Sequence, residues 1–386
     1  MSAASSRTYT IIAGTYNASL LKLTFDPSTS SLSLSETIST STSAGGPFDA
    51  VNPSWLEPHP TQNDLAYAAD QSPEGRVVLF RTSPSGNVSL VASAPTGGFR
   101  PAHACTTADG RWVVLPHFND GRVVALKVDP NKGAAAFDAS SRFEIVYTGS
   151  GPMPLQAVAH PHMAVEHPTS GNVFVIDLGS DRIHELRLNA SDTWEPVQSI
   201  VVQPAGSGPR HMRFSQDGLS AYLLCELTST IHTFRVAAPS RGSSTPTLFE
   251  PVSVRSFLPP GAADAAEDKK LAGGEILLPK DGRQVIVSNR NDGNSGGDAI
   301  AVFPLDPPNS PELNTDPGFY RTGGLHLRGV ELDLFEQKYL LAANMLSSSL
   351  TMFERDLNDA AGALKVVAKA DVPKGVQVTT LLWVRP

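Results

Sequence analysis

Short apolar runs alternate with turn residues along this chain, and the alternation recurs over long distances. The clearest copy starts at Gly208-Pro209-Arg210-His211, passes through Asp217-Gly218 and closes on the apolar run 221–227. Related phrases begin near Asn52-Pro53, Arg100-Pro101, His160-Pro161, Gly273-Gly274 and Leu327-Arg328. Apolar, β-branched runs bounded by Gly, Asp, Asn or Pro predict short strands, and helical periodicity is nearly absent. A unit of short strands that recurs every 45–65 residues or so is typical of a β-propeller.

Seven such units can be laid out, and the first of them lacks its inner strand. The segment 376–384 at the other end of the chain is a lone apolar strand that could supply it. Closure of this kind removes the two free sheet edges of an open ring. We therefore predict an all-β, seven-bladed β-propeller whose C-terminal strand completes the first blade. Because no blade buries its apolar face without its neighbours, residues 1–386 should form one domain.

The sequence also predicts the conformation of two segments between the strands. The segment 131–142 is polar and rich in Gly, Ala and Ser, which predicts a surface loop. The segment 262–270 could form a helical turn or two within an insertion between blades.

Polar side chains recur at two places in each unit. The starts of the first strands carry Ser54, His103, His162, Arg210 with His211, Glu275 and Arg328. The ends of the second strands carry Asp70, His117, Asp177, Glu226, Arg290 and Asn344. Antiparallel pairing brings both sets to one rim of the ring, where polar groups are costly unless they meet water, each other or a ligand. Arg210, Glu226 and Arg290 would form an anion-binding pocket with a titratable group, whereas Asp70, His117, Asp177 and Asn344 suit structural hydrogen bonds.

Composition narrows the classes of partner. The net charge of −8 argues against nucleic acid and anionic membranes, although a few arginines can reverse the field inside a pocket. Residues 1–7 lack the apolar stretch of a signal peptide, and no run of about 18 apolar residues exists, so we expect a cytoplasmic protein that does not enter a membrane. Cys105 and Cys225 lie in apolar runs and are expected to be buried free thiols rather than a disulfide. Without heptads or apolar tails, we expect a monomer.

Other catalytic motifs are missing from the sequence. There is no P-loop, dinucleotide fingerprint or nucleophile elbow, and Gly206-Ser207-Gly208 belongs to a loop. His160 and His162 could bind a metal, but no third ligand is evident, which favours hydrogen bonding or acid–base work. The sequence predicts neither a metal nor an organic cofactor.

The phrases Gly-Pro-Arg-His-Met, Asp-Gly, Tyr-Leu-Leu-Cys-Glu-Leu and Ser-Asn-Arg together resemble the seven-bladed propeller lactonase family. That family includes bacterial propeller-type 6-phosphogluconolactonases and the fungal 3-carboxy-cis,cis-muconate lactonizing enzyme. The resemblance spans nearly the whole chain, is most specific over 160–306 and is closer to the lactonase branch. It implies a cofactor-free site made of His162, Arg210, Glu226 and Arg290.

The resemblance implies chemistry on a lactone ring, foremost the hydrolysis of a sugar-acid lactone by general acid–base catalysis. Arg210 and Arg290 would hold anionic groups and the oxyanion, and Glu226 or His162 would be the base with the other as acid. His103, His211, Glu275 and Arg328 would bind or orient the substrate. Two alternatives stay open: cyclisation of 3-carboxy-cis,cis-muconate by the same pocket, and a propeller scaffold without catalysis. Whether the sugar acid is phosphorylated also stays open.

Overall fold

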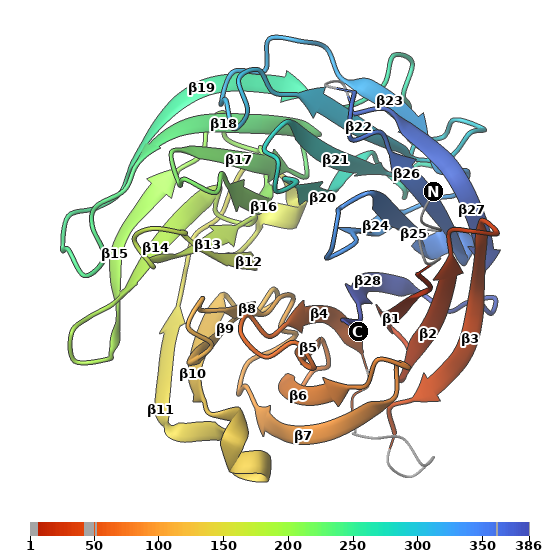
Figure 1. Cartoon of the computed structure of the whole chain (residues 1–386). Coiled ribbons are helices and arrows are strands. Elements are labelled where there is room, and N and C mark those ends of the chain that lie inside the picture. Colours follow the sequence, from red (N-terminus) through yellow and green to blue (C-terminus); the bar gives the residue numbers. More distant parts are fainter. Residues whose placement is uncertain (1–6, 42–49, 51, 360–361, 386) are drawn as a thin grey trace.

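The computed structural model describes residues 7–41, 50, 52–359 and 362–385. These residues form seven four-stranded antiparallel sheets arranged around a common axis (Figure 1). The predicted all-β, seven-bladed propeller is therefore confirmed. Residues 1–6, on which part of the expectation about a signal peptide rests, lie outside the described residues.

The first blade joins the two ends of the chain. It contains β28 (Val378–Trp383), β1 (Tyr9–Thr15), β2 (Ser19–Asp26) and β3 (Ser31–Ser39), in that order from the axis outward. The strand β28 lies antiparallel to β1, with Ala13 opposite Leu381. The predicted closure of the ring by the C-terminal strand is confirmed.

The other six blades use consecutive strands. The second blade contains β4 (Pro53–Pro58), β5 (Leu65–Asp70), β6 (Arg76–Thr82) and β7 (Val88–Pro95), and the third contains β8 (Cys105–Thr106), β9 (Trp112–Pro116), β10 (Arg122–Val128) and β11 (Phe137–Val146). The fourth contains β12 (Pro161–Glu166), β13 (Val173–Asp177), β14 (Arg182–Leu188) and β15 (Trp194–Val201), and the fifth contains β16 (Pro209–Phe214), β17 (Ser220–Cys225), β18 (Thr230–Ala237) and β19 (Leu248–Ser256). The sixth contains β20 (Ala272–Leu277), β21 (Gln284–Arg290), β22 (Ala299–Pro304) and β23 (Gly318–Arg321), and the seventh contains β24 (Leu327–Leu332), β25 (Tyr339–Asn344), β26 (Ser349–Arg355) and β27 (Leu364–Asp371). The described residues also include three short 3-10 helices, η2 (Pro130–Ala135), η3 (Pro154–Gln156) and η4 (Met345–Ser347).

The apolar core lies between neighbouring blades. Tyr9 of the first blade packs edge-on against Tyr339 of the seventh, with ring centroids 5.6 Å apart. Tyr222 and Leu224 of the fifth blade share a buried cluster with Phe303 of the sixth. Each sheet therefore completes its core only with the next sheet, as expected for a propeller.

Most inner strands begin with a β-bulge. In the fifth blade Pro209 pairs with Cys225 and His211 with Leu224, so Arg210 is an extra residue. His162 is the corresponding extra residue in the fourth blade and Arg328 in the seventh. A bulge re-aims its extra side chain away from the regular alternation of the strand. The repeat thus places an extra residue at the same end of the ring in most blades.

Two expectations about connecting segments are wrong. The segment 131–142 contains most of η2 and the start of β11, because the side chain of Asp129 caps the 3-10 turn and the blade needs a fourth strand. The segment 262–270 is not helical. The backbone N–H of Ala265 donates to the carbonyl groups of Lys269 and Asn291 instead, which makes the segment an extended turn.

A His-Pro-Thr sequence follows the inner strands of the second and fourth blades, and its imidazole is buried under the next blade. Nδ1 of His167 accepts the backbone N–H of Ser170, and Nε2 donates to the carbonyl of Gly218 at 2.9 Å. Nδ1 of His59 is bound in the same way, but its Nε2 has no partner in the described part of the chain.

We predict that His167→Ala lowers the free energy of unfolding by about 1 kcal/mol more than His59→Ala does, because only His167 also loses a hydrogen bond across blades. Urea unfolding of both variants measures the difference. Equal losses would show that the hydrogen bond contributes nothing beyond packing.

Candidate functional site

The structure brings Arg210, Glu226 and Arg290 together at one end of the inner strands. Arg210 lies at the bulge of β16, Glu226 follows β17, and Arg290 ends β21. Nε of Arg210 lies 2.9 Å, and a terminal nitrogen of Arg290 2.7 Å, from the same oxygen, Oε2 of Glu226. Nε of Arg290 also donates to the carbonyl of Gly273 at 2.9 Å, which anchors its guanidinium. Two blades therefore supply the three predicted residues.

The cluster has more positive than negative charge. Burial lowers the pKa of Arg210 to about 9, and Arg290 and Arg328 add to the decrease. Burial by itself would raise the pKa of Glu226, but Arg290 and Arg210 outweigh it and hold the pKa below its usual value. Glu226 is therefore an ionised, weakly basic carboxylate. The single carboxylate of Glu226 balances only part of the charge of the two guanidiniums that contact it and of a third nearby. This excess of positive charge favours an anionic ligand.

Arg328 completes this group from the seventh blade. It is the bulge residue of β24, and its guanidinium lies 5.1 Å from the centre of the Tyr16 ring, which follows β1. Its charge acts on Arg210, Glu226 and His162. Sequence reasoning missed Tyr16 because the first unit shows too little of the repeat to be aligned.

His162 begins a chain of three polar side chains that leads inward from the rim. Its Nδ1 lies 3.2 Å from Nε2 of His211, and Nδ1 of His211 lies 2.7 Å from Oε1 of Glu275. Burial, followed by the charge of Arg210, lowers the pKa of both imidazoles well below 6.5. Burial also raises the pKa of Glu275. Both imidazoles are therefore neutral at pH 7.

The register corrects the alignment of His103 and Glu275. The alignment of the chain's own repeats placed them at the strand position of His162 and Arg210. The strand pairing shows that both correspond to His211, one residue further along the strand. Ala102 and Gly274 occupy the bulge position in those blades. Consequently Glu275 bonds His211. The His103 ring packs at a tilt against Trp55, with ring centroids 4.1 Å apart, and its centroid lies 5.9 Å from that of His211.

The first blade, whose inner strand shows least of the repeat, also has a bulge residue. Thr379 is the extra residue of β28, and its hydroxyl donates to the carbonyl of Ser54 at 2.9 Å. The sequence offers no signal for it, because the last strand carries none of the repeated phrase.

The side chains assigned to structural hydrogen bonds behave largely as expected. Asp177 accepts the backbone N–H groups of His160, Gly179 and Ser180, which ties the inner strand to the turn after β13. Asp70 accepts the backbone N–H of Asn52 in the same way at 2.7 Å. Both cysteines are buried and unbridged, as predicted.

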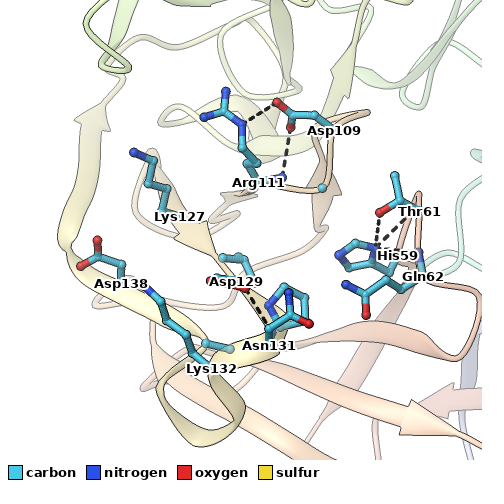
Figure 2. Close-up of a pocket in the computed structure, with 14 residues that line it drawn as sticks. His59, Thr61, Gln62, Asp109, Arg111, Lys127, Asp129, Asn131, Lys132 and Asp138 are labelled. Carbon is cyan, nitrogen blue, oxygen red and sulfur yellow. Dashed lines mark hydrogen bonds and ion pairs between the residues drawn. The ribbon is translucent and has the colours of Figure 1, made fainter.

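A separate hollow of about 350 Å³ lies between the turn after β4 and the outer strands of the third blade (Figure 2). Several of its charged side chains are engaged locally: Nε of Arg111 lies 2.8 Å from Asp109, and Asp129 accepts the backbone N–H of Asn131. None of the predicted site residues lines it. This hollow is therefore not where the predicted chemistry converges.

The described residues contain neither a metal-binding cluster nor a membrane-spanning helix. Over residues 7–41, 50, 52–359 and 362–385, no group of three or more His, Cys, Asp and Glu side chains is arranged to hold a metal ion. No helix in the same part of the chain is long and apolar enough to cross a membrane.

Comparison with known proteins agrees with the fold and the motifs. Residues 10–380 match the family described as "Lactonase, 7-bladed beta-propeller". The 6-phosphogluconolactonase of Bacillus subtilis is 28% identical over 262 residues, which are 67% of this chain and 67% of that protein. The 6-phosphogluconolactonase of Formosa agariphila is 26% identical over 67% of this chain and 68% of its own length.

A solved structure shares the fold over almost the whole chain. The periplasmic gluconolactonase PpgL of Pseudomonas aeruginosa superposes with a TM-score of 0.78 at 24% identity, covering 98% of this chain and 99% of that one. With the family match over residues 10–380, the conclusion is that this chain belongs to the seven-bladed β-propeller lactonase family.

Proposed function

We propose that the substrate of this lactonase is the lactone of an anionic sugar acid, with 6-phosphogluconolactone as the first candidate. The observation that carries the proposal is the excess of guanidinium groups at the rim: Arg210 and Arg290 share one carboxylate, and Arg328 is close by. A phosphate or carboxylate on the sugar would balance this charge. The names of the Bacillus and Formosa relatives point to the same substrate.

In the proposed mechanism His162 is the base. Within the described residues its Nε2 has no hydrogen-bond partner, and the ring is neutral, so this nitrogen can take a proton from water. The water oxygen then attacks the lactone carbonyl carbon, and Arg210 and Arg290 stabilise the oxyanion of the tetrahedral intermediate. As the carbon–oxygen bond of the ring breaks, protonated His162 returns the proton to the leaving alkoxide. Glu226 holds the two guanidiniums side by side.

This assignment predicts an unusual pH profile. Protonation removes the lone pair of His162, so kcat/KM should fall only when the pH drops through a pKa that burial, Arg210, His211, Arg328 and Arg290 hold well below 6.5. We expect kcat/KM to be constant from pH 7.5 to below 6.5, after subtraction of spontaneous hydrolysis.

The pH profile of Arg328→Leu tests whether neighbouring positive charge lowers the pKa of His162. Removing one positive charge should move the acid limb toward higher pH. A wild-type limb centred at pH 6.5, or a limb that Arg328→Leu leaves in place, would contradict the assignment.

The substrate is tested with a pH-indicator assay on a panel of lactones. The panel contains glucono-δ-lactone, its 6-phosphate, other aldonolactones and a carboxymuconolactone, with Glu226→Gln as the control for protein-dependent acid release. Faster acid release from the phosphorylated lactone than from glucono-δ-lactone supports the proposal. Equal rates would show that the arginines do not select for phosphate.

The alternatives are weaker. Cyclisation of 3-carboxy-cis,cis-muconate is not favoured, since the two curated relatives reported above are named as lactonases. If no sugar lactone were hydrolysed, loss of 3-carboxymuconate ultraviolet absorbance would test the cyclisation. No reaction in that assay either would favour a propeller scaffold without catalysis. Cytoplasmic location, a monomeric state and independence from cofactors remain parts of the proposal, and the Pseudomonas neighbour is a periplasmic protein.

A further inference from the structure

We infer that Glu275 is a positioning residue: acting through His211, it determines which nitrogen of His162 carries the proton and so leaves Nε2 of His162 free as the base. The inference rests on the proposed function, because it deepens the role given there to His162. Glu275 itself lies behind His211 and is expected to touch no substrate.

The first step is the hydrogen bond between Glu275 and His211. Oε1 of Glu275 accepts the backbone N–H of Ile276 at 3.0 Å and lies 2.7 Å from Nδ1 of His211. Since Oε1 already accepts one N–H, we place the proton of the neutral imidazole on Nδ1, where it donates to Oε1. Glu275 is 4% exposed and His211 1%, so water does not offer Nδ1 another partner.

The second step is the environment of the other nitrogen of His211. A terminal nitrogen of Arg210 lies 3.2 Å from Nε2 and 3.5 Å from Nδ1 of His211, so it lies over the ring and along neither lone pair, and a guanidinium cannot accept a proton from either nitrogen. The same nitrogen of Arg210 also donates to the carbonyl of Gly274, which holds it in place. Because the proton of the neutral ring is on Nδ1, facing Glu275, Nε2 of His211 carries the lone pair.

The third step passes this state to His162. Its Nδ1 lies 3.2 Å from Nε2 of His211, which can only accept, so His162 donates from Nδ1. Its Nε2 then holds the lone pair that the proposed mechanism needs. Without an acceptor at Glu275, Nδ1–H of His211 would be buried and unpaired, which favours the opposite tautomer in both rings.

The test compares Glu275→Leu with Glu275→Gln, because only glutamine keeps an oxygen that can accept from His211 and Ile276. Nitrogen NMR of histidine-labelled protein reports the protonated nitrogen of each ring, and kinetics on the best lactone are measured in parallel. In the wild type, both rings should be protonated on Nδ1. Glu275→Gln should retain these tautomers and most of kcat. Glu275→Leu should populate the Nε2–H tautomer of both rings and lower kcat at least tenfold, with KM changed less than about threefold.

Glu331→Leu is the matched control, because Glu331 lies on the inner strand of the next blade. Its carboxyl accepts the backbone N–H of Leu332 and does not bond a histidine. It should change neither tautomers nor kcat. An Nε2–H wild-type His162, or an equal loss of kcat in Glu275→Gln and Glu275→Leu, would overturn the inference. Full activity in His162→Ala would instead overturn the base assigned under the proposed function, while the tautomers would still test the link between Glu275 and His211.

Discussion

Glu226→Gln is expected to lower kcat/KM for the lactone by about two orders of magnitude or more. Oε2 of Glu226 is the point at which Arg210 and Arg290 meet. The neutral amide cannot balance either guanidinium, and its NH2 group would repel them. The two arginines would then separate, and the oxyanion would lose its pair of donors. If Glu226 were instead the base, the same variant would lose the base, so the loss is large in either case.

Kinetics of Glu226→Gln on the best lactone of the panel measure this effect, with circular dichroism and thermal unfolding to show that the propeller is intact. Glu331→Gln, a change of the same kind on β24, is the control and should keep wild-type kinetics. An intact Glu226→Gln protein with near-wild-type turnover would remove Glu226 from the site. The pH profile separates its two roles: loss of the acid limb in this variant would indicate that Glu226, not His162, is the base.

Arg290→Ala should cause a second loss of about two orders of magnitude or more in kcat/KM. Its guanidinium is anchored by the carbonyl of Gly273 and faces Glu226, so it is oriented before the substrate arrives. Preorganised donors of this kind stabilise developing negative charge without rearrangement. The alanine variant also leaves Arg210 as the single guanidinium in contact with Glu226 among the described residues.

Arg290→Lys is the matched control, because it keeps a positive charge but not the planar fork. A comparison of glucono-δ-lactone with its 6-phosphate then assigns the role of Arg290. Loss on both substrates indicates oxyanion stabilisation, whereas loss restricted to the 6-phosphate indicates binding of the phosphate. Activity of Arg290→Ala within a few-fold of the wild type on both would exclude either role.

Much of this site could be predicted because the propeller repeats. Arg210 was identified at a strand start, and Glu226 and Arg290 at strand ends, and antiparallel pairing then required them to share a rim. Their contact through a single oxygen of Glu226 confirms that geometry. The resemblance to the lactonase family was carried by the same phrases, and the family match over residues 10–380 bears it out.

The errors have equally physical causes. His103 and Glu275 were aligned one position too early because a β-bulge adds a residue to a strand without leaving a mark in the hydrophobic pattern. The segment 131–142 was misjudged because part of it pairs with β10 as the fourth strand of its blade, and 262–270 because the N–H of Ala265 bonds the carbonyl of Asn291, far along the chain.

The blade count, the closure of the ring and the residue types gathered at one rim could be predicted from the sequence, since all three follow from a local pattern repeated along the chain. The contacts among those residues could not. The link from Glu275 to His211 joins neighbouring blades across 64 residues of sequence, and that from His211 to His162 joins blades across 49. Such contacts depend on how blades pack against one another, and so does the electrostatic field that keeps His162 neutral, because its largest contribution is burial.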